Sequence, residues 1–360
     1  MAGCYYALAL VAILRRAKTQ GPEGAPASLT TPVSVLKPVY GWDDRVAEAV
    51  ASHARLDYPE FELLLGVRAN DVAPAEEMRR RYPGSAIRIV PATTVMPNGK
   101  VGSLIDLAAA AKYPILVIND ADICVAPDYL KAVTHPLSNP QIGLVTALYR
   151  ATATSFASQF EALGVATEFA PSVLVARLLG VAEFALGSTM AVRAEDLERM
   201  GGFRAIGDYL ADDYQLGAHI TRLGQHVEFA DTVVETTLGG GSWADVWKHQ
   251  VRWSRTIRVS RPSGYYGYVV TQATFWAAIA ALAGYWQLAA GVLAVRIVAG
   301  TLAAGKVLHD SAAAVRWWMI PLRDLFGFAV WLAAAFGRTV EWRGMRLRLT
   351  RDGRIRPAGG

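Results

Sequence analysis

The stretch that decides the fold is Ile115-Leu116-Val117-Ile118-Asn119-Asp120-Ala121-Asp122. Its four apolar residues predict a short buried strand that ends in two carboxylates, Asp120 and Asp122. Because side chains alternate along an extended chain, both carboxylates point to the same side and can face one cation or one diphosphate. In open α/β sheets, ligands bind beyond the carboxyl ends of the strands, where these acids lie. The alternative is that Asp122 caps the turn before a helix that starts at Pro127-Asp128.

Strand and helix patterns alternate before this stretch. Apolar runs predict strands at 33–36, 62–67 and 87–90, and helical periodicity predicts helices at 43–55, 74–82 and 99–111. This alternation predicts a Rossmann-like α/β domain with a mostly parallel sheet, over residues 32–235.

Three further polar residues then fall near the same edge of the sheet. Lys37 ends the first strand, Asp71 follows the second, and Lys100 opens the helix that leads to the Asp-x-Asp strand. An acid at this edge suits a uracil or ribose, and a lysine at a helix start suits phosphate. Each of these residues taken alone is more often an ordinary surface charge.

The composition indicates a membrane portion. Hydrophobic residues make up 53% of the 360 residues, and the mean hydropathy is +0.24, which is high for a soluble protein. The net charge is +5, and the tail 338–360 is rich in arginine. Basic residues beside apolar segments indicate a cytoplasmic face and anionic lipid, and no motif indicates nucleic acid. The two cysteines give no disulfide framework, which fits a reducing compartment.

Apolar segments occur at both ends of the chain. The N-terminal segment 1–16 is expected to be a membrane anchor that is short or truncated, because its apolar run is briefer than the ~20 residues a span needs. A linker is expected at 17–31. Residues 263–337 are expected to hold membrane helices: a hairpin at 268–284 and 288–304, in which Arg296 should face another helix, and a third stretch at 325–336.

Two apolar segments are not expected to cross the membrane fully. A third C-terminal crossing at 325–336 would place the basic tail outside, against the positive-inside rule, so we expect this stretch to be re-entrant or interfacial. Residues 155–187 contain charged residues and are expected to form amphipathic helices of the catalytic domain. Residues 236–262 carry tryptophan and basic residues that suit a helix lying along lipid headgroups.

A family resemblance rests on a series of short motifs. They are, in chain order, Leu36-Lys37-Pro38, Asp71, Asn98-Gly99-Lys100-Val101, Asp120, Gly201-Gly202-Phe203, Leu210-Ala211-Asp212-Asp213-Tyr214 and Gln250-Val251-Arg252-Trp253. From about residue 33 to the C-terminus, the chain resembles the ceramide glucosyltransferase family, whose members are inverting GT-A glycosyltransferases that act on membrane lipids. Two features depart from the family pattern. One residue, and not two, separates Gln250 from Arg252, and Asp122 completes a full Asp-x-Asp.

The resemblance implies roles for these residues. Asp213 matches the catalytic aspartate, and Asp212 takes the more variable neighbouring position. The Asp-x-Asp pattern itself predicts that Asp120 and Asp122 hold Mg²⁺ or Mn²⁺ against the diphosphate of a UDP-sugar donor. The donor site would draw on Lys37, Asp71, Lys100, Asp120, Gln250, Arg252 and Trp253. Without the acidic motifs, an Arg-Trp pair in an amphipathic helix would be a membrane-interface anchor.

The expected protein is a multi-pass membrane glycosyltransferase with a cytoplasmic catalytic domain, in a bacterial inner membrane. It would transfer N-acetylglucosamine or glucose from a UDP-hexose to a lipid hydroxyl, with a hopanoid polyol favoured over ceramide as acceptor. One alternative is a processive polysaccharide synthase, which needs more membrane helices than this chain offers. Another is a non-catalytic membrane protein that binds nucleotide sugars, which would have no use for Asp213.

Overall fold

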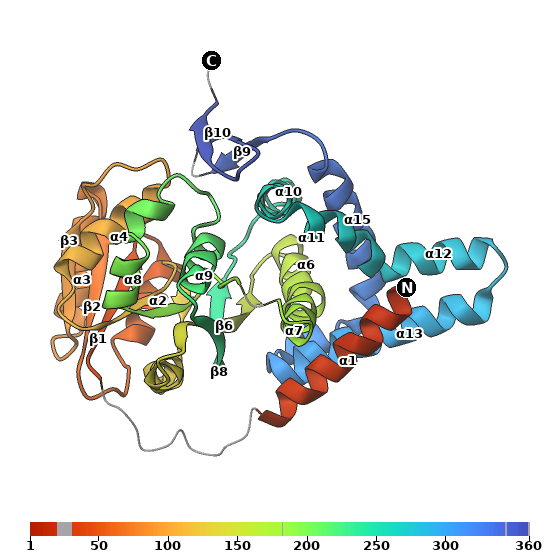
Figure 1. Ribbon diagram of the computed structural model, residues 1–360, viewed down its shortest axis with the longest axis horizontal. Helices are drawn as coiled ribbons and strands as arrows, with labels where there is room; N and C mark the ends of the chain where they lie inside the picture. The colour runs from red at the N-terminus through yellow and green to blue at the C-terminus, as the bar shows by residue number, and fades with distance from the viewer. Residues whose placement is uncertain (20–30, 182, 343, 359–360) are drawn as a thin grey trace. The chain divides into compact units, whose positions relative to one another are not determined.

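The computed structural model describes residues 1–19, 31–181, 183–342 and 344–358 (Figure 1). The chain forms two compact units. The sheet unit comprises Pro22–Tyr149 and Ala182–Thr237, and the helical unit comprises Met1–Gly21, Arg150–Val181 and Leu238–Gly360. Most of the predicted linker falls on residues 20–30, which lie outside the described residues.

An eight-stranded sheet, in the order β3-β2-β1-β4-β7-β6-β8-β5, forms the centre of the sheet unit. Its strands are β1 (Val33–Pro38), β2 (Phe61–Val67), β3 (Ile87–Pro91), β4 (Ile115–Ile118), β5 (Ile123–Cys124), β6 (Ile142–Thr152), β7 (Met190–Arg193) and β8 (His226–Thr237). The strands β3, β2, β1 and β4 are parallel. Antiparallel pairing then joins β7 to β4 and to β6, and β5 to β8. The expected α/β fold with its parallel strands is confirmed.

The helices of this unit are α2 (Asp44–His53), α3 (Val72–Arg81), α4 (Gly99–Ala110), α5 (Tyr129–Thr134), α8 (Ala194–Arg199) and α9 (Asp212–Arg222). Apolar side chains of α4 and α9 pack with those of the central strands in one core, which includes Leu104, Ile118, Val192 and Ile220. The three helices predicted before the Asp-x-Asp strand are α2, α3 and α4, with ends that differ by one or two residues. Packing against both neighbours explains why β4 is buried along its whole length.

Strand register brings two distant segments together at the end of β4. Ile118, the last residue of β4, pairs with Met190, the first residue of β7, and the two strands run antiparallel. Residues that follow Ile118 therefore lie opposite residues that precede Met190. This pairing places Asp120 beside the segment that contains Gly187.

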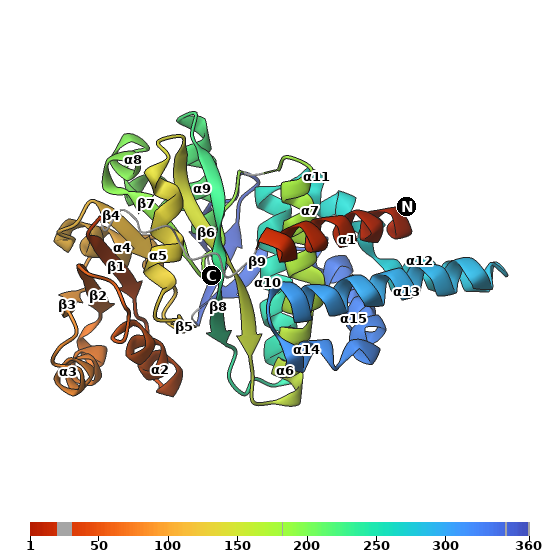
Figure 2. The same cartoon turned by 90° about the horizontal axis from the view of Figure 1, so that it is seen from below.

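The helical unit contains α1 (Ala2–Thr19), α6 (Phe156–Gly164), a π-helical turn (Val165–Phe169), α7 (Ala170–Leu178), α10 (Trp243–Ser260), α11 (Pro262–Gly267), α12 (Ala273–Leu282), α13 (Trp286–Leu302), α14 (Ser311–Ala314) and α15 (Ile320–Ala334). Figure 1 shows α12 and α13 as an antiparallel hairpin, and α1 packs along α13 (Figure 2). A helical hairpin thus lies where membrane helices are expected, although α12 covers only Ala273–Leu282 of the expected 268–284. Within the described residues one helical segment, Trp286–Val307, is long and apolar enough to cross a membrane.

Arg296 of α13 is fully buried and faces another helix, as predicted. Its guanidinium pairs with the Asp324 carboxylate of α15 at 2.6 Å and donates a hydrogen bond to the Thr167 carbonyl at 2.9 Å. The Tyr6 ring of α1 lies 4.8 Å from the same guanidinium. These contacts satisfy the charge inside an apolar helix.

The basic tail is ordered, which the sequence did not indicate. It folds into a three-stranded antiparallel sheet of β9 (Thr339–Trp342), β10 (Met345–Leu349) and β11 (Ile355–Pro357). In β10 the side chains of Leu347 and Leu349 are buried and those of Arg346 and Arg348 are exposed. Arg343 and residues 359–360 of the predicted tail lie outside the described residues.

Candidate active site

Lys100 is the centre of a charged cluster in the sheet unit. Its Nζ lies 2.8 Å from Asp120 Oδ1 and 2.9 Å from Asp212 Oδ2. Burial, the largest influence, lowers the pKa of Lys100, but the carboxylates of Asp120, Asp212 and Asp213 together raise it well above its usual value. Lys100 is therefore a permanent cation that holds the end of β4 to the start of α9.

The N-termini of α4 and α9 meet through the side chain of Asn98. Its Oδ1 accepts hydrogen bonds from the main-chain N–H groups of Lys100 and Val101 and so caps α4. Its Nδ2 donates to the Tyr209 carbonyl at 2.8 Å and to Asp212 Oδ1 at 3.3 Å. Asn98 is fully buried, so it fixes where Lys100 and Asp212 point.

Asp213 follows Asp212 in the first turn of α9 and is less buried than its neighbour. Its Oδ2 accepts a hydrogen bond from the Gly187 N–H at 3.0 Å, and its Oδ1 accepts one from the Tyr214 N–H at 2.7 Å. Burial and the Asp212 carboxylate raise the pKa of Asp213 to about 6, against the opposing effect of Lys100. A carboxylate with such a pKa is mostly ionised at pH 7 and is still a competent base.

Asp120 and Asp122 both follow the end of β4, but their side chains have different surroundings. The Asp120 side chain is 41% exposed, which is the largest exposure in the Lys100 cluster. Asp122 Oδ2 accepts a hydrogen bond from the Thr236 hydroxyl of β8 at 2.9 Å. Burial, followed by the negative charge of Asp120, raises the pKa of Asp122.

Lys37 lies beneath the Asp-x-Asp turn and is fully buried. Its Nζ donates hydrogen bonds to the carbonyl oxygens of Asp120 at 2.9 Å and of Ile123 at 3.1 Å. Burial lowers the pKa of Lys37 to about 8, while the nearby acidic groups act in the opposite direction. The structure thus gives Lys37 main-chain partners in the turn that carries the two acids.

Asp71 orders the loop after β1. It is buried, and its Oδ2 accepts a hydrogen bond from the Gly41 N–H at 3.1 Å. Beside it the guanidinium of Arg68 lies 4.6 Å from the centre of the exposed Tyr40 ring. A planar ring, a cation and an acid therefore gather where the loops after β1 and β2 meet.

The remaining predicted residues belong to the helical unit. Gln250 of α10 donates a hydrogen bond to Glu161 Oε1 of α6 at 2.8 Å and accepts one from Arg323 Nη2 of α15, also at 2.8 Å. The Trp253 ring packs 4.7 Å from the His249 ring and 6.3 Å from the Phe169 ring. Arg252 lies half-buried on the same helix.

Residues 1–355 match the sequence profile of Glycosyl transferase family 21. The chain belongs to this family. The predicted resemblance to ceramide glucosyltransferases is thereby confirmed.

Two curated relatives of the family 21 chain are ceramide glucosyltransferases. Ceramide glucosyltransferase 1 of Caenorhabditis elegans is 29% identical over 198 residues, which cover 53% of this chain and 42% of the relative. The ceramide glucosyltransferase of Komagataella phaffii is 33% identical over 114 residues, which cover 29% of this chain and 22% of the relative. The chain thus spans less than half the length of either relative.

A solved structure establishes the fold of the family 21 chain. It is a mannosyltransferase from Pyrobaculum calidifontis in complex with GDP-Man and Mn²⁺, which is similar with a TM-score of 0.53 at 18% identity. The similarity covers 92% of this chain and 94% of that protein. The expected GT-A fold is therefore confirmed.

Gly187 is a site residue that the sequence did not single out. A Cβ atom built on it would lie 3.3 Å from Asp213 Oδ2, 3.4 Å from Asp120 Oδ2 and 3.6 Å from Lys100 Nζ. The bare Cα therefore leaves open the space between these three charged groups. Only the pairing of β7 with β4 brings Gly187 there, and no local motif marks it.

Gly187→Ala is expected to lower turnover by about 10²-fold, because a methyl group would occupy the space between Asp213, Asp120 and Lys100 in which the reacting atoms must lie. The main chain at Gly187 has no positive φ, so alanine adds no backbone strain. Gly84→Ala is the matched control, since nothing lies within 4 Å of its Cβ position. Comparable steady-state rates for the two variants would contradict this assignment.

Proposed function

We propose that this chain transfers a hexose from a UDP-sugar to the hydroxyl group of a membrane lipid, with inversion at the anomeric carbon. The observation that carries the proposal is the placement of Asp213, Asp120 and Lys100 around the open space at Gly187. Membership of family 21 and the GT-A fold support a glycosyltransferase, and the names of the curated relatives support a lipid acceptor.

In the proposed reaction, Asp213 is the general base. The acceptor oxygen forms a bond to the anomeric carbon as the bond from that carbon to the diphosphate breaks, and the hydroxyl proton passes to Asp213. The Gly187 N–H holds Asp213 Oδ2 in place. Asp212 is the more buried of the two acids, and its ion pair with Lys100 gives it a positioning role.

The donor would bind along the carboxyl ends of the parallel strands. Asp71, with Tyr40 and Arg68 beside it, suits the uracil and ribose because it offers an acid next to a planar ring. Lys100 would stabilise negative charge on the diphosphate. Lys37 would act as a positioning residue that holds the Asp-x-Asp turn. Arg252, on the helical unit, is proposed to bind diphosphate oxygens through its guanidinium, while Gln250 and Trp253 of the same helix line the pocket of the helical unit.

Asp120 and Asp122 would supply only some of the ligands that a divalent cation needs. Their carboxylates are hard oxygen ligands, and the repulsion that raises the pKa of Asp122 would be relieved by a cation between them. Among the described residues, no group of three His, Cys, Asp or Glu side chains is placed to hold a metal ion. Donor phosphates would therefore complete the coordination of Mg²⁺ or Mn²⁺. When bound, the ion would offset the charge that builds on the departing diphosphate.

Chelation is expected to abolish transfer. Activity should fall to background in EDTA and return when Mn²⁺ or Mg²⁺ is added in excess. Titration calorimetry should show weak Mn²⁺ binding to the protein alone and tighter binding in the presence of UDP, because the phosphates supply ligands. Full turnover in EDTA would remove the ion from the reaction and leave Asp120 as a sugar or ribose ligand.

The raised pKa of Asp213 predicts the pH dependence. The base must be ionised to act, so kcat/KM for the lipid should fall tenfold per pH unit below about pH 6, where Asp213 becomes protonated. An aspartate with an ordinary pKa of about 3.9 would keep full activity down to about pH 5. Rates measured between pH 4.5 and 8.5 with saturating donor decide between the two profiles.

Glucose and ceramide are the first donor sugar and acceptor to test, because the relatives reported above are named ceramide glucosyltransferases. None of those names supports the N-acetylglucosamine or the hopanoid polyol expected from the sequence. These are therefore the second donor sugar and acceptor to test. Membranes that contain the protein are incubated with labelled UDP-glucose or UDP-N-acetylglucosamine, and lipid is separated from polymer. Label in lipid supports the proposal. Label in polymer would favour a processive synthase, and no incorporation would favour a non-catalytic nucleotide-sugar binder.

We also propose that the protein is a multi-pass membrane protein whose catalytic unit faces the cytoplasm. The apolar segment Trp286–Val307 supports a membrane span, and the arginine-rich tail supports a cytoplasmic face. The α10 helix, which carries three tryptophans and several basic residues, is proposed to lie at the membrane interface.

A further inference from the structure

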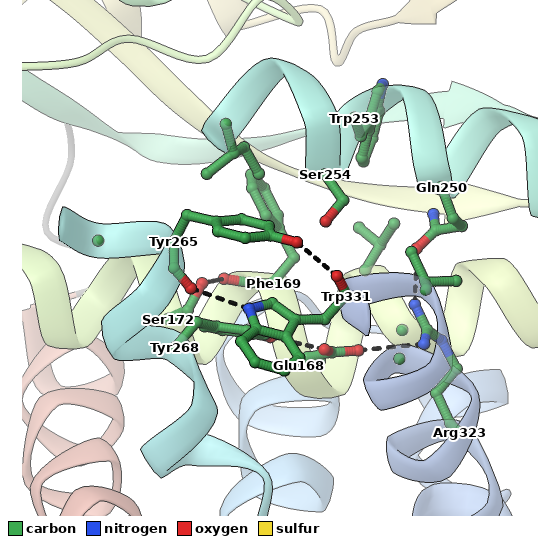
Figure 3. A pocket seen from close by; sticks show the side chains of 16 residues that line it. Glu168, Phe169, Ser172, Gln250, Trp253, Ser254, Tyr265, Tyr268, Arg323 and Trp331 are labelled. Atoms are coloured by element: carbon green, nitrogen blue, oxygen red, sulfur yellow. Dashed lines mark hydrogen bonds and ion pairs between the residues drawn. The ribbon is translucent and has the colours of Figure 1, made fainter. Parts of the chain in front are cut away.

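A pocket lies entirely within the helical unit, among the α6–α7 segment, α10, α11 and α15 (Figure 3). Its cavity volume is about 150 Å³, which is smaller than a typical small-molecule site and suits one part of a larger ligand. Trp253, Tyr265 and Trp331 supply aromatic wall, while Glu168 and Arg323 supply charge. The pocket thus combines an apolar lining with a few polar groups, as ligand sites do.

Glu168 lines the pocket from the π-helical turn Val165–Phe169, which lies between α6 and α7. Such turns occur frequently at functional sites. Glu168 Oε1 accepts a hydrogen bond from the Tyr268 hydroxyl at 2.5 Å. Its Oε2 lies 3.2 Å from Arg323 Nη1, yet it accepts no hydrogen bond within the described parts of the chain. One carboxylate oxygen in the pocket is therefore available to a hydrogen-bond donor.

Arg323 is held in place from two sides. Its Nη2 donates to Gln250 Oε1, and Gln250 in turn donates to Glu161. A Cβ atom at Gly164 would lie 2.2 Å from Arg323 Nε, and one at Gly327 would lie 3.0 Å from Glu168 Oε1. The two glycines thus make room for the ion pair at the pocket. Stacking of Tyr265 on Trp331, with centroids 5.8 Å apart, joins α11 to α15 beside it.

We propose that this pocket binds the lipid acceptor, an amphiphile whose hydroxyl or amide group donates a hydrogen bond to Glu168 and whose apolar part lies against Trp253, Tyr265 and Trp331. The inference rests on the proposed function, since it names the binding site of that lipid. Among the residues that the structure describes, Arg323 Nε and Nη1 are likewise buried without a hydrogen-bond acceptor, so the pocket offers both donors and an acceptor. A neutral polyol or amide carries both kinds of group, whereas a wholly apolar lipid would leave these atoms unpaired.

Two variants test the pocket in the full-length protein reconstituted in phosphatidylcholine vesicles. Ser254→Phe fills the pocket from α10, and Glu168→Gln removes the charged acceptor at nearly constant shape. Each should raise KM for ceramide, or for a hopanoid polyol if that is the acceptor, at least tenfold while KM for the UDP-sugar changes less than twofold. Ser263→Phe, an exposed residue of α11 outside the pocket, is the matched control and should leave both constants unchanged. Unchanged lipid KM in Ser254→Phe would overturn the proposal.

Photo-crosslinking gives a readout that does not depend on turnover. Ceramide with a diazirine in its acyl chain should label residues 250–257 or 323–331 of the wild-type protein. Excess unlabelled ceramide should suppress this labelling, whereas excess phosphatidylcholine should not. Labelling confined to other segments, or equal suppression by both lipids, would overturn the pocket assignment. Pocket labelling without sugar transfer to any lipid would retain the site and contradict the proposed function, so the two failures are distinguishable.

Discussion

Asp213→Asn is expected to lower turnover by about 10³-fold, within the range that general-base catalysis contributes. Asparagine keeps the shape of the side chain and one oxygen for the Gly187 N–H, but it takes up no proton from the acceptor hydroxyl. Binding of UDP should change less than threefold, because the proposed donor ligands are other residues. Single-turnover rates with labelled UDP-sugar and calorimetric UDP titration measure the two effects.

Asp44→Asn provides the control, since Asp44 is an exposed residue at the start of α2. It should retain wild-type turnover. Asp212→Asn distinguishes the two neighbouring acids, because it removes the buried one of the two partners of Lys100 and should lower stability more than Asp213→Asn does. If Asp213→Asn kept a tenth or more of the wild-type rate, Asp213 would not be the base.

Lys100→Met is expected to destabilise the sheet unit by about 3–5 kcal/mol, the usual cost of removing one partner of a buried ion pair. Asp212 is only 7% exposed and would lose its cation. The pKa of Asp213 should also rise, because Lys100 lowers it in the wild-type protein. The acid limb of the pH profile should therefore move to higher pH in any folded fraction. Thermal unfolding in detergent and the pH profile measure the two effects.

Lys131→Met is the matched control for Lys100→Met. Lys131 also pairs with an aspartate, Asp57, at 2.6 Å, but the two side chains are 39% and 75% exposed. Exposed pairs contribute about 0–1 kcal/mol, so this variant should unfold close to the wild-type temperature. Equal destabilisation by the two substitutions would show that the Lys100 cluster has no special structural role.

Much of the sheet unit was predictable from local patterns. The apolar runs and helical periodicity before Asp120 predicted β1 to β4 and α2 to α4, because each element buries one continuous apolar face. The parallel order of these strands follows from their alternation with helices. The C-terminal hairpin and the partner helix for Arg296 were also predictable, since an unpaired charge inside an apolar helix is costly.

Contacts that depend on long-range register were not predictable. Gly187 reaches Asp120 only through the antiparallel pairing of β7 with β4. The burial of Lys37 was not predictable either, because its partners are main-chain carbonyl oxygens, which every residue carries and no residue type identifies. The small sheet of the tail was missed although apolar and arginine side chains alternate along β10 as in a half-buried strand, because the arginines were interpreted only as a basic tail. The position of Glu168 depends on a π-helical turn, which apolar periodicity does not reveal.

The anomeric configuration of the glycolipid product tests the central claim most directly. Direct attack by the acceptor hydroxyl, with Asp213 as its base, inverts the α-linkage of the UDP-sugar and gives a β-glycoside. The purified protein is incubated with UDP-glucose, and the glycolipid product is isolated from the lipid fraction. NMR then measures the coupling constant between the sugar protons on C1 and C2. A β-linked lipid, absent with Asp213→Asn, is the predicted result. An α-linked lipid would contradict the account.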